Sequence, residues 1–171
     1  MANSKLGRPT KERMALIRGQ VSDLLWNGYL ETTVEKAKAV KRQAEKMLTL
    51  AINTQSDVIR TTKTKTDDKG TKIEQEVIND GPQKLAARRK LMGFCYDLQE
   101  QRRPKEAKDA FLARTNDIKH PLIEKIFNVY AVKLNDRSER LGQRGGYLRI
   151  MKLGARRGDN AEMARLEIIL D

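Results

Sequence analysis

The sequence predicts an α+β fold of two layers, in which helices cover a small mixed three-stranded sheet. Two β-prone runs near the C-terminus, at about 147–153 and 163–170, are separated by a short connector and are most simply an antiparallel pair. A third β-prone run, YLETT, lies at about 29–33. Elsewhere apolar residues recur at the three- and four-residue spacing of helices, which bury one stripe against a sheet.

Two helices are predicted in the first third of the chain. From Thr10 an apolar stripe runs until Asn27-Gly28, a pair that ends helices. Thr32 then stands three residues before Glu35, which is the spacing of a capping box, and an apolar face with a strongly basic opposite face follows. We therefore expect the second helix to carry cations towards solvent.

The middle of the chain predicts further helices. One begins at 80–82, an Asp-Gly-Pro sequence, and runs to about Arg102, where Arg103-Pro104 ends or kinks it. Residues 105–114 are helical again by composition, and Pro121 opens the next helix. In the helix that begins near residue 82, Arg88 and Arg89 are expected to face outward. Its inward-facing residues are expected to be Leu85, Met92, Cys95 and Tyr96.

Two segments fall outside the predicted core. Residues 1–9 contain Lys5, Arg8 and two backbone breakers and are predicted to form an extended basic arm, the alternative being a frayed terminus. Between about 55 and 80, loose alternation of β-prone residues on both sides of DDKG predicts an exposed hairpin, the alternative being a disordered loop. Residues 10–171 are otherwise expected to form one domain.

Positive charge dominates the chain, with 35 Lys and Arg against 23 Asp and Glu and a net charge of +12. From Arg137 to Asp159 seven basic side chains stand against one acid before Asp159, with a β-prone run in the middle, which predicts a basic loop, a strand and a second basic loop. Arginines pair with phosphate in a fixed geometry, and glycines allow a bulky partner to approach the backbone. A nucleic acid is the simplest partner, and a solvated basic turn is the alternative.

Enzymatic and membrane functions find little support in the residue types. His120 is the only histidine and Cys95 the only cysteine, so neither a two-histidine zinc site nor a thiolate cluster is available. GQRGG lacks the spacing of phosphate-binding loops. No run approaches the roughly 18 apolar residues of a membrane span. We expect a cytoplasmic protein with no catalytic site, no cofactor, no metal and no membrane partner.

Five segments carry a likeness to a known family. They are KLGR at 5–8, RMALIR at 13–18, LETT at 30–33 leading into AKAVKRQAEKMLTLA, AARR at 86–89 and GGYLRIMKLGARRGDNAEMARLEII at 145–169. In these segments, which cover well over half of the chain, the sequence resembles the bacterial ribosomal large-subunit protein number seventeen. Insertions at about 55–80 and 99–120, Leu148 in place of a threonine, and the weakly basic start MANS depart from the family pattern.

The resemblance implies a structural constituent of the large ribosomal subunit that binds large-subunit ribosomal RNA near the nascent-chain exit, beside neighbouring proteins, notably number thirty-two. The alternative is a free-standing RNA- or DNA-binding regulator, although eight aromatic residues are few for a stacking platform. The residues predicted to bind RNA lie in the arm, on basic helix faces and in the C-terminal basic stretch. They are Lys5, Arg8, Lys11, Arg13, Arg18, Lys36, Lys38, Arg42, Arg88, Arg89, Arg137, Arg144, Tyr147, Arg149, Lys152, Arg156 and Arg157.

Overall fold

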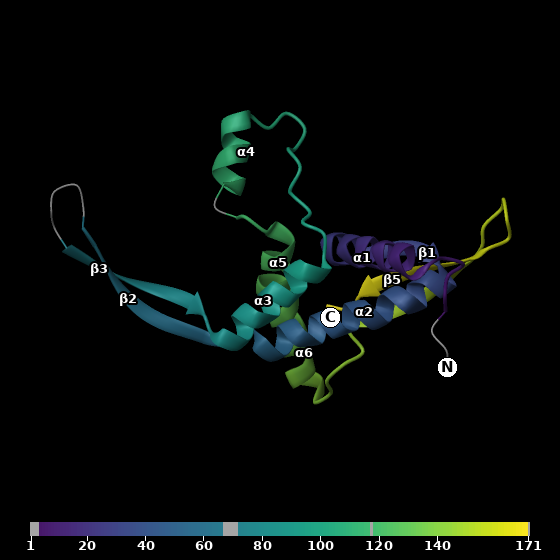
Figure 1. The fold of residues 1–171 in the computed structure, drawn as a ribbon, viewed down its shortest axis with the longest axis horizontal. Helices are drawn as coiled ribbons and strands as arrows, with labels where there is room; N and C mark the ends of the chain where they lie inside the picture. Colours follow the sequence, from purple (N-terminus) through teal and green to yellow (C-terminus); the bar gives the residue numbers. More distant parts are fainter. Residues whose placement is uncertain (1–3, 67–71, 117, 171) are drawn as a thin grey trace.

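The computed structural model describes residues 4–66, 72–116 and 118–170. It confirms the predicted α+β class (Figure 1). In chain order the elements are α1 (Thr10–Asn27), β1 (Tyr29–Thr33), α2 (Val34–Thr54), β2 (Val58–Thr66), β3 (Lys72–Asp80), α3 (Pro82–Phe94), α4 (Lys108–Thr115), α5 (Pro121–Lys125), the π-helical segment η1 (Ile126–Ala131), α6 (Val132–Leu141), β4 (Leu148–Ala155) and β5 (Glu162–Ile168).

The main sheet has the strand order β1-β5-β4, and both pairings are antiparallel. The three predicted strands are therefore present, but the sheet is not mixed, because β5 separates the two strands that run in the same direction. β4 also extends to Ala155, past the predicted end at about residue 153. A bulge between Lys152 and Gly154 shifts the register there, and Gly154 has the positive φ of 94° that such an irregularity favours.

The core lies between this sheet and α2, which contacts all three strands as well as α1, α3 and η1. One stripe of α2 is buried, from Val34 through Val40 and Ala44 to Ile52. The opposing sheet face contributes the cross-strand row Leu30, Leu166 and Ile150. The continuous helical segment α5-η1-α6 begins at Pro121, as predicted, and crosses α2 (Figure 1). The hydrophobic stripe read from the sequence of α2 is thus the centre of the fold.

α3 is shorter than predicted, since it ends at Phe94 rather than near Arg102. The cause is a tertiary hydrogen bond, because the backbone N–H of Tyr96 donates to Ser22 Oγ of α1 at 2.9 Å instead of continuing the helix. Cys95 is buried as expected, and Leu91 is buried with it. The other three residues expected to face inward are instead exposed. They are Leu85, Met92 and Tyr96.

Two local predictions were wrong near the ends of helices. Thr32 does not cap α2, because it is a buried residue of β1 whose hydroxyl accepts a hydrogen bond from Gln20 at 3.2 Å. The first part of the basic stretch is not a loop, since Arg137 and Arg140 belong to α6, which continues to Leu141. For Thr32, a tertiary hydrogen bond outweighed the local capping pattern.

The two segments read from the sequence as insertions, at about 55–80 and 99–120, both project from the body (Figure 1). β2 and β3 form the predicted exposed hairpin, paired from Val58 with Asp80 outward, and the DDKG turn lies outside the described residues. The second projection contains α4, which covers 108–115 rather than 105–114. Arg114 ties this projection together through ion pairs with Glu100 and Glu106. Within the described ranges, no helix has the length and apolar character required to cross a membrane.

Candidate nucleic-acid interface

Several predicted cations meet at one end of the molecule. The strand register places Thr33, which directly precedes α2, opposite Met163, which in turn pairs with Gly154 beside the β4–β5 turn. The described part of the N-terminal arm, residues 4–9, lies at the same end of the long axis (Figure 1). We call the basic residues of these segments the cationic end. They are Lys5, Arg8, Lys11, Arg13, Lys36, Lys38, Lys152, Arg156 and Arg157.

Within the cationic end, the two arginines of the β4–β5 turn differ. Arg156 donates to both carboxylate oxygens of Asp159, at 3.0 and 2.6 Å. These hydrogen bonds lower the pKa of Asp159 from 3.8 to about 2. Arg157 is exposed and has no ion pair among the described residues. Arg156 therefore shapes the turn, and Arg157 is the cation that the turn presents.

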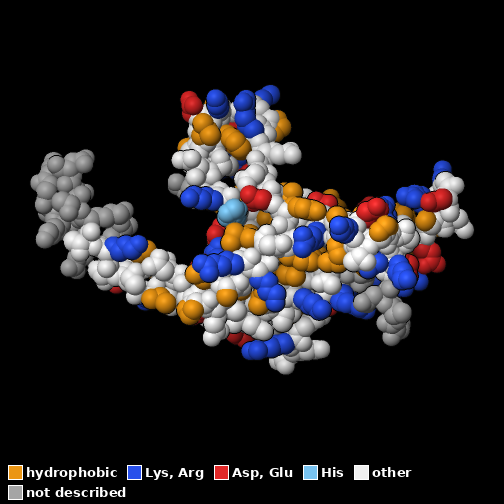
Figure 2. All heavy atoms as spheres, in the orientation of Figure 1, with side chains coloured by type: hydrophobic (Ala, Val, Ile, Leu, Met, Phe, Trp, Pro, Cys, Tyr) orange, Lys and Arg blue, Asp and Glu red, His pale blue; other side chains and the backbone are white. Residues whose placement is uncertain are grey.

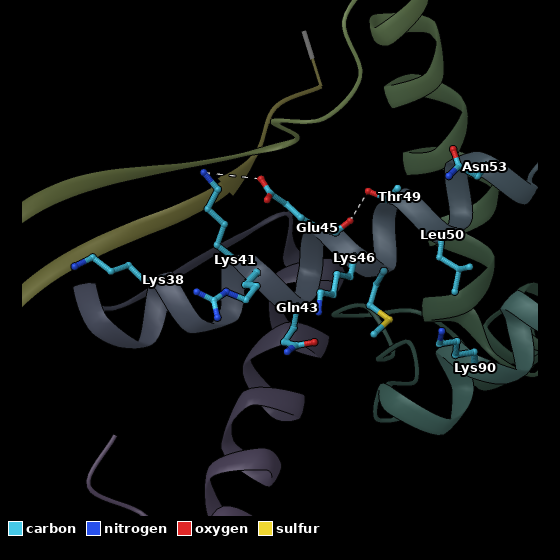
Figure 3. A pocket seen from close by; sticks show the side chains of 11 residues that line it. Lys38, Lys41, Gln43, Glu45, Lys46, Thr49, Leu50, Asn53 and Lys90 are labelled. Atoms are coloured by element: carbon cyan, nitrogen blue, oxygen red, sulfur yellow. Dashed lines mark hydrogen bonds and ion pairs between the residues drawn. The ribbon is translucent and has the colours of Figure 1, made fainter. Parts of the chain in front are cut away.

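A second basic surface follows the solvent-facing side of α2. Here a hollow of about 890 Å³ is lined by side chains of α2 and by Lys90 of α3, and we call it the α2 groove (Figure 3). Lys90 points from α3 towards α2 in this view. The cations lining the groove are Lys38, Lys41, Arg42, Lys46 and Lys90. This arrangement follows from the helical period, because the residues opposite the buried stripe share one exposed face.

The α2 groove is electropositive because five cations line it and Glu45 is the only carboxylate among the lining residues. Lys41 Nζ lies 3.8 Å from Glu45 Oε1, and Lys38 Nζ lies 2.8 Å from Oε1 of Glu35, which is outside the groove. Lys38–Glu35 is exposed and Lys41–Glu45 is partly exposed, and surface ion pairs are worth little, so a phosphate can compete for the lysines. Lys46 and Lys90 have no ion pair within the described part of the chain. Lys and Arg side chains follow α2 along the lower edge of the body (Figure 2).

Arg137 and Arg144 lie apart from the α2 groove. Arg137 shares α6 with Lys133 and Arg140, and these three cations and Asp136 line a smaller hollow of about 280 Å³ beside Leu170. Arg144 is an exposed residue of the connection between α6 and β4. Of the two arginines of α3, Arg89 is exposed next to Lys90.

The structure removes Tyr147 and Arg88 from the candidate surface. Tyr147 is only 2% exposed, since the residue directly before β4 packs into the core. Arg88, expected to face outward, bridges Asp80 and Glu124 at 2.5 Å each and stacks on the ring of Phe127. Burial alone would lower the pKa of Arg88, but its hydrogen bonds and the two carboxylate charges outweigh burial and raise it. Arg88 is thus a structural cation.

Two more of the predicted residues are engaged within the fold. Arg149 projects from the sheet and pairs with Glu167 of the neighbouring strand. Arg18 is partly buried, and its guanidinium lies 5.5 Å from the centre of the Phe94 ring. Both side chains are therefore oriented by protein neighbours rather than held ready for phosphate.

Sequence reasoning did not single out Lys46 and Lys90 as binding residues. For Lys46 the signal was present, because Lys38, Arg42 and Lys46 recur every four residues and so share a helix face. For Lys90 it was not, because only the tertiary packing of α3 against α2 brings this residue to the groove.

Catalytic chemistry gains no support from the one cysteine and the one histidine. Cys95 and His120 line a common hollow of about 70 Å³. Burial raises the pKa of the Cys95 thiol to about 11, so the thiolate that would act as a nucleophile is scarce at neutral pH. His120 lies 3.3 Å from Asp97. No cluster of potential metal ligands occurs among the described residues.

The chain is similar in sequence to known proteins over nearly its whole length. The family described as Ribosomal protein L17 matches residues 16–169. A large ribosomal subunit protein bL17 from Acetivibrio thermocellus is 33% identical, over 98% of this chain and 99% of that protein. The protein of the same name from Lachnospira eligens is 33% identical over 96% and 97%. The one from Finegoldia magna is 35% identical over 99% of this chain and 86% of its own length.

An α+β domain with an open, strongly basic groove and a cationic end has the surface features of a nucleic-acid-binding protein, because clustered Lys and Arg neutralise phosphates. The comparisons identify one family within that class. The chain belongs to the ribosomal protein L17 family, which confirms the resemblance read from its sequence segments.

Proposed function

We propose that this chain is a structural constituent of the large ribosomal subunit that binds large-subunit ribosomal RNA and supports translation in the cytoplasm. Membership of the ribosomal protein L17 family supports this function and supports a non-enzymatic role. The structural observation that carries it is the α2 groove, where five cations face one carboxylate in an open hollow. Such a surface suits a polyanion better than a small substrate.

In this proposal both the α2 groove and the cationic end contact the RNA. Lysines act as point charges on flexible stems, so the groove follows the RNA backbone without reading sequence. RNA in folded regions is selected mainly by its shape and by contacts to phosphates and sugars. The two surfaces share Lys38 and together extend along one elongated body, and this extent would fix how the protein is oriented on the RNA.

In this proposal the chain divides into an extended arm at 1–9 and one RNA-binding domain at 10–171, with insertions at about 55–80 and 99–120. The arm adds Lys5 and Arg8 to the cationic end. We expect other large-subunit proteins to be its neighbours, notably number thirty-two near the nascent-chain exit. A free-standing regulator is less favoured, because the relatives that match nearly the whole chain are named as large-subunit proteins.

Sedimentation tests the proposal directly. A cell lysate is separated on a sucrose gradient at moderate salt, and the chain is detected across the fractions. We expect it to travel with the large subunit and to be absent from the small subunit. A chain that remained at the top of the gradient with free proteins would favour the regulator instead.

A further inference from the structure

The β2–β3 hairpin extends away from the body (Figure 1). Its strands pair over nine positions, from Val58 with Asp80 to Thr66 with Lys72. Hairpins of only two strands are marginally stable in water unless something covers a face. Among the described residues, no other helix or strand packs closely against the hairpin beyond its base.

The base of the hairpin is a built joint. Asp57, just before β2, accepts hydrogen bonds from the backbone N–H groups of Gln83 and Lys84 at 2.8 and 3.1 Å, and so caps α3 from outside the helix. Its carbonyl also accepts from the N–H of Gly81 at 2.9 Å. A Cβ on Gly81 would lie 2.1 Å from Asp57 Oδ1, so only glycine fits beside this cap.

A second set of contacts holds the other strand. Asp80, the last residue of β3, pairs with Lys84 at 2.9 Å and with Arg88 at 2.5 Å. Arg88 continues to Glu124 of α5 and stacks on Phe127, so the joint reaches the core. Both ends of the hairpin are thereby bonded to the body at its base.

Large apolar side chains are exposed on both faces just beyond this joint. Ile78 is 64% exposed, the highest value for a large apolar residue in the described part of the chain, and it shares a face with Val58, which is 41% exposed. Ile59, 48% exposed, lies on the opposite face near Val77. Val58 and Ile78 thus form a contiguous exposed aliphatic pair on one face, and contiguous exposed apolar surface is a feature of interaction sites.

The charge of the hairpin argues against RNA as its partner. Residues 58–80 contain five Lys or Arg and five Asp or Glu, so their net charge is zero in a chain of net charge +12. Binding to RNA is driven by net positive charge that releases counterions, and this segment offers none in excess. An apolar centre with polar and charged residues around it is the arrangement found in protein–protein interfaces.

We propose that the β2–β3 hairpin is a protein-binding arm, held at its base by the Asp57–Gly81 and Asp80–Arg88 joint, whose Val58 and Ile78 pack from one face on an apolar patch of another protein of the large subunit. This inference rests on the proposed function, because the partner is sought within the same particle. The arm would add a protein contact to an RNA-bound body.

Site-specific photo-cross-linking tests the arm in the full chain. p-Benzoylphenylalanine replaces Ile78 in one variant and Asn53, which lines the α2 groove, in another. Large subunits containing each variant are purified, irradiated, and treated separately with ribonuclease and protease. We expect the Ile78 adduct to survive ribonuclease and to contain peptides of one other large-subunit protein. The Asn53 adduct should be to RNA.

The possible outcomes distinguish failure of the protein-binding arm from failure of the proposed function. An Ile78 adduct to RNA, or no adduct at Ile78 while Asn53 cross-links, would overturn the protein-binding arm and leave the proposed function standing. Failure of both variants to enter large subunits, with the unchanged chain also absent from them, would instead overturn the proposed function. An added Asp57→Ala change should reduce the Ile78 cross-linking yield several-fold without changing the Asn53 yield, since it loosens the joint alone.

Discussion

Neutralising the two groove lysines that have no ion pair within the described residues should weaken RNA binding in a salt-dependent way. In the double variant Lys46→Gln, Lys90→Gln the fold should be nearly as stable as before, because exposed changes of this kind cost within about 0.5 kcal/mol. Each phosphate contact contributes about 0.9 to the slope of log affinity against log salt. Losing two contacts should flatten that slope by about 1.8. Between 50 and 200 mM salt, this amounts to about a tenfold smaller loss of affinity.

The assay is filter binding of the full chain to its large-subunit ribosomal RNA at a series of salt concentrations. The control is Lys108→Gln with Lys119→Gln, an equal loss of charge on the projecting segment that contains α4, where both side chains are exposed. We expect the control to keep the slope of the unchanged chain. Equal slopes for the groove variant and the control would refute the reasoning, because the groove lysines would then be merely solvated.

Other predictions concern the joint and the β4–β5 turn. Asp57→Ala should destabilise the fold by about 1 kcal/mol in denaturant melts, as losing a helix cap does. Gly81→Ala should also destabilise it, and the double variant should cost less than the sum because both changes break one cap. By carboxyl-carbon NMR, Asp159 should titrate near pH 2, and Arg156→Gln should move the midpoint towards 3.8. Since the folded pKa is the lower one, this pair's stabilisation is present above pH 3.8 and fades as the pH falls towards 2.

The sequence predicted the parts of the fold that depend on periodicity. The buried stripe of α2, the end of α1 at Gly28 with its positive φ of 84°, and the start of a helix at Pro121 all follow from local rules. The sequence could not predict the end of α3, because the hydrogen bond from Tyr96 to Ser22 joins residues 74 positions apart. Nor could it predict the strand order, which depends on where β1 docks.

The sequence predicted which residues of the candidate site are charged, but it did not predict which of them form ion pairs within the protein. Arg156 and Arg157 are neighbours of equal charge, and only the turn geometry shows that Asp159 engages the first. In the sequence AARRK, Arg88 has the pattern of an exposed cation. In the structure it forms ion pairs with Asp80 of β3 and Glu124 of α5. A count of cations therefore locates a binding surface approximately, and ion pairing decides which of its members are available.

Competition for assembly in cells tests the central claim most directly. The charge-reversed pair Lys46→Glu, Lys90→Glu is expressed beside the unchanged chain, and the ratio of the two is measured by mass spectrometry in purified large subunits. Each charge-assisted hydrogen bond lost is worth about 1.5–3 kcal/mol, and 1.4 kcal/mol corresponds to a factor of ten. We expect the variant to be depleted at least about tenfold, while Lys108→Glu with Lys119→Glu enters in proportion to its expression. Equal incorporation of both variants would contradict the assignment of the α2 groove to ribosomal RNA.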